Sequence, residues 1–88
     1  MKEKNMDNEL ESNIKDQIQS LIKQRYRRTE SFHTAILLYS KEIEINYPSL
    51  EDRRKLAVRL DYTESMGQEI QKIINIGKII RECNLNIT

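Results

Sequence analysis

His33 and Cys83 are the only histidine and the only cysteine of the chain, and a Cys–His pair formed by them is a formally possible arrangement for nucleophilic catalysis. Such chemistry also needs a third group that orients the base and a loop that stabilises an oxyanion, and the sequence shows neither. Cys83 lies among isoleucines near the end of a helical pattern, where a thiol usually packs as a small, inert side chain. We therefore predict that the protein is not an enzyme.

Other kinds of chemical site also lack their components. A structural zinc site needs about four Cys or His ligands, whereas the chain has one of each. Gly67 and Gly77 stand within a helical pattern, at a spacing that matches neither a phosphate-binding loop nor a dinucleotide fingerprint. They indicate instead a close approach of two helices or a weak point in one helix. We predict no cofactor, no metal ion and no small-molecule substrate.

Composition sets the scale of the fold. The chain has 88 residues, two glycines and one proline, which favours one small domain of long helices with few tight turns. Fifteen Lys and Arg balance fourteen Asp and Glu, so nucleic acid would have to bind a local patch rather than a molecule-wide field. We expect residues 1–8 to be a disordered tail and residues 9–88 to be a single domain.

The composition also bears on location. A single cysteine permits no intramolecular disulfide, which is typical of the reducing cytoplasm or nucleus. The first nine residues hold no apolar run of the kind found in a signal peptide. No stretch approaches the roughly 18–20 apolar residues of a membrane span. We expect an intracellular protein that does not enter membranes.

Apolar residues recur at helical spacing along most of the chain. A first amphipathic helix is predicted from about Glu9, with a narrow stripe and a basic end. A second helix begins after Thr29 or Ser31 and stops near Asn46, because Pro48 disfavours helical geometry at the residue before it. Ser49 is predicted to cap a third, short helix.

Thr63 is predicted to cap the last helix, with Glu64 in its first turn, and this helix is rich in isoleucine. Its apolar residues fall on two stripes, which is typical of a helix with more than one neighbour. The predicted fold class is therefore all-α: a compact three-helix unit over roughly 30–83, preceded by a projecting amphipathic N-terminal helix, four helices in total.

The segment from Leu56 to Met66 has the pattern of a helix-turn-helix, with a short apolar helix, a turn and a Thr cap. Residues 47–51, read Tyr-Pro-Ser-Leu-Glu, followed by Arg53, Leu56 and Leu60, resemble the second helix of the homeodomain family and the turn before it. The resemblance covers about eighteen residues and implies a DNA-reading helix after Thr63. That stretch departs from the family, because residues 68–75 lack its Trp-Phe pair, its Asn and its Arg cluster.

Two basic clusters are the candidates for contact with phosphates. The residues of this possible nucleic-acid site are Arg25, Arg27, Arg28, Arg53, Arg54 and Lys55. The alternative interpretation of the first cluster is a solvated helix end followed by a linker.

The apolar stripes of the first and last helices are the candidates for a protein interface. The residues of this predicted interface are Leu10, Ile14, Ile18, Leu21, Ile76 and Ile79. The first stripe could instead fold back on the chain's own core, and both arrangements bury the same residues. We predict a small adaptor, inhibitor or assembly subunit with a protein partner or a second copy of itself. The alternatives are a helix-turn-helix transcriptional regulator and, on the basic cluster alone, an RNA- or ribosome-associated helix.

Overall fold

A computed structural model describes the backbone of residues 2–87 and the side chains of residues 9–83. All regular structure in this part is helical, which confirms the predicted all-α class. The helices are α1 (Lys2–Lys23), α2 (Arg28–Leu38), α3 (Ser40–Asn46), α4 (Leu50–Arg59) and α5 (Met66–Ile87). Five helices replace the expected four, because the predicted second helix is divided into α2 and α3.

The division falls at Tyr39, whose φ and ψ are −103° and 19°. Its N–H still donates to the carbonyl of Ala35 and its own carbonyl accepts from Ile43, so a single residue leaves helical geometry. The next residue, Ser40, is buried against Gly77 of α5, where an added Cβ would lie 2.5 Å from the Ser40 Oγ. The chain therefore bends where it meets another helix, at a place that no glycine or proline marks.

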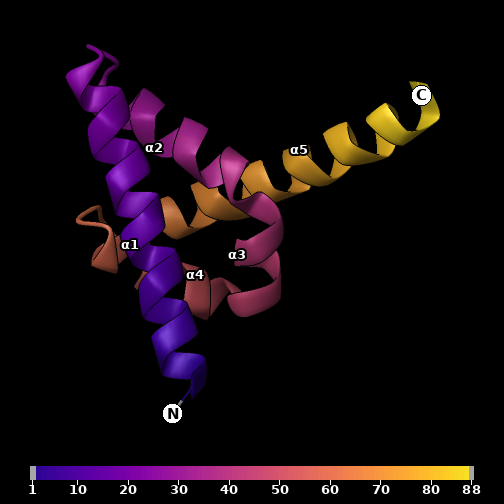
Figure 1. Cartoon of the computed structure of the whole chain (residues 1–88). Helices are drawn as coiled ribbons and strands as arrows, with labels where there is room; N and C mark the ends of the chain where they lie inside the picture. Colours follow the sequence, from indigo (N-terminus) through magenta and orange to yellow (C-terminus); the bar gives the residue numbers. More distant parts are fainter. Residues whose placement is uncertain (1, 88) are drawn as a thin grey trace.

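The first helix does not project from the fold, which corrects the prediction. α1 packs along α2, and Leu10, Ile14 and Ile18 belong to the same core as Phe32 and Ile36 (Figure 1). Burial of its apolar stripe within the chain removes that stripe from water, which is the main energy available to a small fold. Helix α1 also continues back to Lys2, through most of the segment predicted to be a disordered tail.

Polar contacts fix α1 across its other neighbours. The Tyr47 hydroxyl donates to Glu11 Oε2 at 2.7 Å, and Arg59 Nη1 donates to the same oxygen at 2.8 Å. The hydrogen bond and the negative charge of Glu11 raise the pKa of the Arg59 guanidinium above its ordinary value. One carboxylate on α1 thus joins the helix to the end of α3 and to the last turn of α4.

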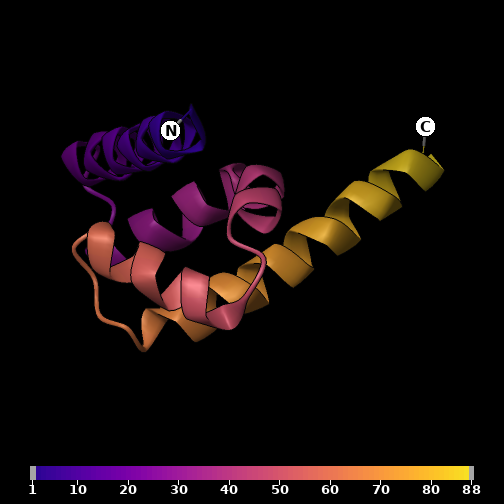
Figure 2. The same cartoon turned by 90° about the horizontal axis from the view of Figure 1, so that it is seen from below.

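The helix that extends beyond the fold is α5. Its first half packs against α4 and α2, and its last turns run beyond the other helices (Figures 1 and 2).

No helix in the described part of the chain is long and apolar enough to cross a membrane. The predicted Ser49 cap is present, because its side chain accepts from the N–H of Asp52. The last helix begins at Met66, two residues after the Glu64 that the predicted Thr63 cap would place in its first turn.

Two helices end in left-handed residues that are not glycine. Arg25 follows α1 with φ 76°, and Asp61 follows α4 with φ 69°. At each end the next residue, Tyr26 or Tyr62, donates its N–H back to the carbonyl of Leu21 or Ala57, which is the Schellman pattern. The positive φ is therefore a consequence of helix termination.

Arg25→Gly should raise the free energy of unfolding by about 1 kcal/mol, because glycine adopts this φ without the steric cost that arginine bears. Asp61→Gly should give a smaller gain, since the short polar side chain of aspartate tolerates the left-handed region better. Urea denaturation of both variants measures the two gains. A loss of stability in Arg25→Gly would contradict the left-handed geometry.

Candidate functional site

An apolar groove lies between α2 and the second half of α5. It encloses about 540 Å³, and its apolar walls are Leu37 and Leu38 from α2 and Ile80 from α5. Its remaining lining residues are Thr34, Ser40, Lys41, Glu42, Gly77 and Arg81. Helix α2 turns Phe32, Ala35 and Ile36 toward the core, and the helical period then leaves Leu37 and Leu38 on the outer side. These two leucines are 38% and 62% exposed.

An isoleucine ridge runs along α5 beside the groove; we define it as Ile76, Ile79, Ile80 and Cys83. The three isoleucines are 50%, 58% and 44% exposed, and Cys83 is exposed as well. Ile70 and Ile74, on the core side of the same helix, are buried. The two stripes expected from the sequence are thus one buried face and one exposed face. Ile80, which the spacing assigns to the same stripe as Ile70 and Ile74, lies instead on the exposed face.

Polar contacts hold the projecting part of α5 against α3. Arg81 Nη1 donates to Ser40 Oγ at 2.9 Å, and Arg81 Nη2 lies 3.6 Å from a Glu44 carboxylate oxygen. Lys78 Nζ approaches the other oxygen of Glu44 at 3.3 Å. These contacts keep the wall of the groove in place, so the apolar surface is presented by an ordered element.

The predicted protein interface is only partly exposed. Leu10, Ile14 and Ile18 are 9%, 0% and 4% exposed, so they contact the chain's own core and are unavailable to a partner. This corrects their assignment as interface residues, in favour of the alternative that the stripe folds back. Leu21 is half-buried. Ile76 and Ile79 are exposed, and their role in an interface stays a prediction.

The six predicted phosphate-binding cations do not form one surface. Arg53 is 9% exposed and its Nε donates to the Tyr47 carbonyl at 2.8 Å, which corrects its assignment as a nucleic-acid contact. Arg25, Arg27 and Arg28 lie at the α1–α2 junction, at one end of α1, whereas Arg54 and Lys55 lie on α4 (Figure 1). Arg54 is also within 4.0 Å of Glu51 in the preceding turn.

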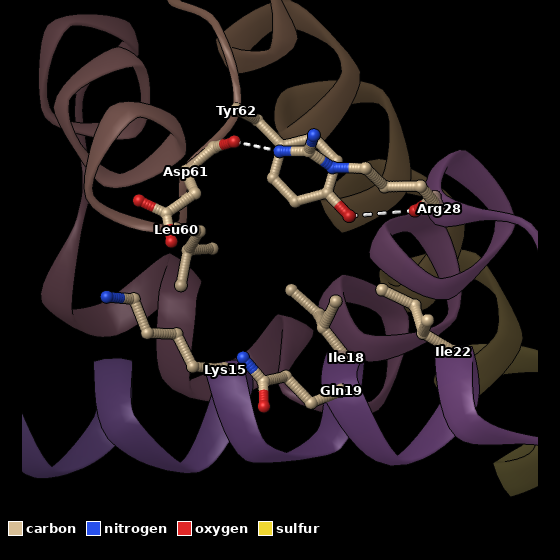
Figure 3. Close-up of a pocket in the computed structure, with 8 residues that line it drawn as sticks. All are labelled: Lys15, Ile18, Gln19, Ile22, Arg28, Leu60, Asp61 and Tyr62. Carbon is tan, nitrogen blue, oxygen red and sulfur yellow. Dashed lines mark hydrogen bonds between the residues drawn. The ribbon is translucent and has the colours of Figure 1, made fainter.

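A second hollow, of about 290 Å³, lies between α1 and the loop that joins α4 to α5 (Figure 3). It is lined by Lys15, Ile18, Gln19 and Ile22 on one side and by Arg28, Leu60, Asp61 and Tyr62 on the other. The Arg28 guanidinium lies 4.3 Å from the centre of the Tyr62 ring and donates to the Asp61 carbonyl. The Tyr62 hydroxyl donates to the Arg28 carbonyl at 2.8 Å. Arg28 is therefore engaged in holding the loop against α2.

His33 and Cys83 are not brought together. His33 Nε2 lies 3.5 Å from Glu69 Oε1, near the start of α5. Cys83 lies fourteen residues after Glu69 on the same helix. At a rise of 1.5 Å per residue, Glu69 and Cys83 are about 21 Å apart along the helix axis. Among the described residues, no three His, Cys, Asp or Glu side chains form a group that could hold a metal ion.

Sequence reasoning did not identify the groove. Leu37 and Leu38 are adjacent in a helix, so they point in directions about 100° apart, and the core lies on neither of these sides. The presence of two large apolar residues on the outer side of α2 could have been recognised from the hydrophobic pattern of the sequence, as a signal of an exposed apolar surface. Comparison of the chain with family models, with characterised proteins and with solved structures finds no match.

Proposed function

We propose that the protein is a non-catalytic interaction module that binds a protein through the apolar groove and the isoleucine ridge. The observation that carries the proposal is the continuity of these apolar residues, two from α2 and four from α5, on a chain in which one residue in three is charged. Exposed apolar residues scattered singly are normal on a soluble protein, whereas a contiguous patch is typical of an interaction site.

The surroundings of the surface fit this role. Lys41, Glu42 and Arg81 line the polar edge of the groove, so an apolar centre is bordered by charges of both signs. Such borders orient a partner more than they add affinity. The polar contacts of Arg81 and Lys78 hold α5 in place before any partner arrives, which reduces the entropy lost on binding.

The helix-turn-helix alternative has weaker support. An amide-rich hollow formed by Leu50, Gln68, Gln71, Lys72 and Asn75 lies on the first half of α5. Lys72 is the one cation among these five, and its Nζ lies 3.8 Å from Glu69. Arg53 is buried and Arg28 holds the loop, so two of the six candidate cations are already engaged within the chain, and contacts to phosphates supply most of the affinity for DNA.

Photo-crosslinking in the native cell extract tests the proposal. A photoreactive amino acid is placed at Ile79, on the ridge, and separately at Val58, which is 48% exposed on α4 and outside every hollow described above. We expect protein adducts at position 79 and few at position 58, because only the first position lies on the docking surface. Adducts should disappear at position 79 when Leu38→Glu is added, since a charge in the groove opposes apolar burial. Equal adduct yields at both positions would contradict the proposal.

A further inference from the structure

We propose that the occupant of this surface is a second copy of the chain, bound through antiparallel pairing of the two α5 helices. This inference rests on the proposed function, because it names the partner of the same surface. Three observations lead to it: the spacing of the residues along the exposed side of α5, the charges that flank them, and the amount of surface that the single chain exposes.

The exposed side of α5 has the spacing of a helix–helix seam. Glu69, Lys72, Ile76, Ile79 and Cys83 follow one another at intervals of three, four, three and four residues. This alternation is that of the a and d positions which pack against another helix in a coiled coil. Within the chain, α2 and α4 cover the opposite, buried side of the helix, so the seam has no partner of its own among the described helices.

Pairing by a two-fold axis places the apolar part of this seam at its centre. When the axis passes midway between Ile76 and Ile79, each Ile76 lies against Ile79 of the other copy. Four isoleucines then form the middle of the interface, and a two-fold interface is necessarily self-complementary. The projecting end of each α5 then lies beside the first half of α5 of the other copy.

The same alignment pairs opposite charges. It brings Lys72 of one copy beside Glu82 of the other, and the symmetry produces this pair twice. Glu82 makes no ion pair among the described residues, and Lys72 is 71% exposed with one contact at 3.8 Å to Glu69. Glu82 is therefore free to form the intermolecular pair, and Lys72 exchanges its contact with Glu69 for it, which favours the antiparallel register over others.

The surface that the single chain exposes is larger than that of a compact monomer of the same mass. A compact monomer of 10.5 kDa exposes about 5,400 Å², whereas this chain exposes 6340 Å². The excess, about 900 Å², belongs to the whole chain, to which the projecting end of α5 contributes (Figure 1), and it is large enough to include the roughly 800 Å² that each partner buries in an interface of standard size.

Light scattering after size exclusion, across micromolar to millimolar concentrations, tests the pairing. The expected mass is twice 10.5 kDa, falling toward the monomer mass on dilution. Ile79→Glu should give a folded monomer by circular dichroism, because the residue is 58% exposed and outside the core. Val58→Glu, a matched exposed position on α4, should remain dimeric.

Charge reversal tests the register. Lys72→Glu and Glu82→Lys should each weaken the dimer about tenfold, since each places two pairs of like charges at the interface. The double variant should recover the wild-type association, which a structural effect of either change would not produce. Lys72→Cys should also form an intermolecular disulfide with Cys83 under mild oxidation.

The outcomes separate this inference from the proposed function. A wild-type monomer at all concentrations, or a dimer that Ile79→Glu leaves intact, would overturn the pairing. If the photoreactive residue at position 79 then captures a different protein, the docking surface stands and only its occupant was wrong. If it captures nothing, the docking proposal fails as well.

Discussion

Replacement of Ile14 by alanine should lower the free energy of unfolding by about 2–5 kcal/mol, the usual cost of truncating a buried aliphatic side chain. Ile14 is 0% exposed and packs in the core formed with Phe32 and Ile36. A domain of this length has a total stability of only about 4–13 kcal/mol. The variant should therefore lose a large fraction of its stability and unfold at a much lower urea concentration than the wild type, which urea denaturation monitored by circular dichroism measures.

Ile22→Ala is the matched control, on the same helix and with the same atoms removed. Ile22 is 41% exposed, so its loss should cost less than about 1 kcal/mol. The comparison distinguishes a packed α1 from a projecting one. Equal, small effects of the two changes would mean that α1 does not belong to the cooperative fold.

The sequence alone was sufficient for the helix boundaries that have a local chemical cause. Pro48 ends the preceding helix at Asn46, and the Ser49 hydroxyl accepts from Asp52 as its spacing predicts. The break at Tyr39 has no such local signal, because it arises where Ser40 meets α5. The packing of α1 on the core could not be predicted from the sequence either. The apolar stripe of Leu10, Ile14 and Ile18 is equally suited to a groove on a partner protein and to the chain's own core.

In the candidate site, too, some features have a local signal in the sequence and others depend on tertiary contacts. Ile76 and Ile79 are exposed on the second stripe of α5, which the period of the last helix had already distinguished from the first. The groove depends on how α2 and α5 lie side by side, which is long-range information. The burial of Arg53 depends on the Tyr47 carbonyl to which it donates, and composition cannot separate such a cation from a solvated one.

Gly67→Ala should destabilise the fold by about 2 kcal/mol, although alanine is the better helix former by about 1 kcal/mol. A Cβ at residue 67 would lie 2.9 Å from both the Cα and the N of Arg54. These are backbone atoms of α4, so no side-chain rotation relieves the clash and the two helices must separate. Overpacking of this kind costs about 1–3 kcal/mol, and we expect the upper end.

Gly77→Ala provides the contrast within the same helix. Its Cβ would lie 2.5 Å from Ser40 Oγ and 3.1 Å from Ser40 Cβ, both side-chain atoms. The hydroxyl can rotate away, at the expense of its hydrogen bond from Arg81, and the gain in helix propensity offsets about 1 kcal/mol of that loss. The net change should be close to zero. Urea midpoints that rank Gly67→Ala at or above Gly77→Ala would contradict the close approach of α4 and α5, because only a backbone neighbour makes the first substitution the more costly.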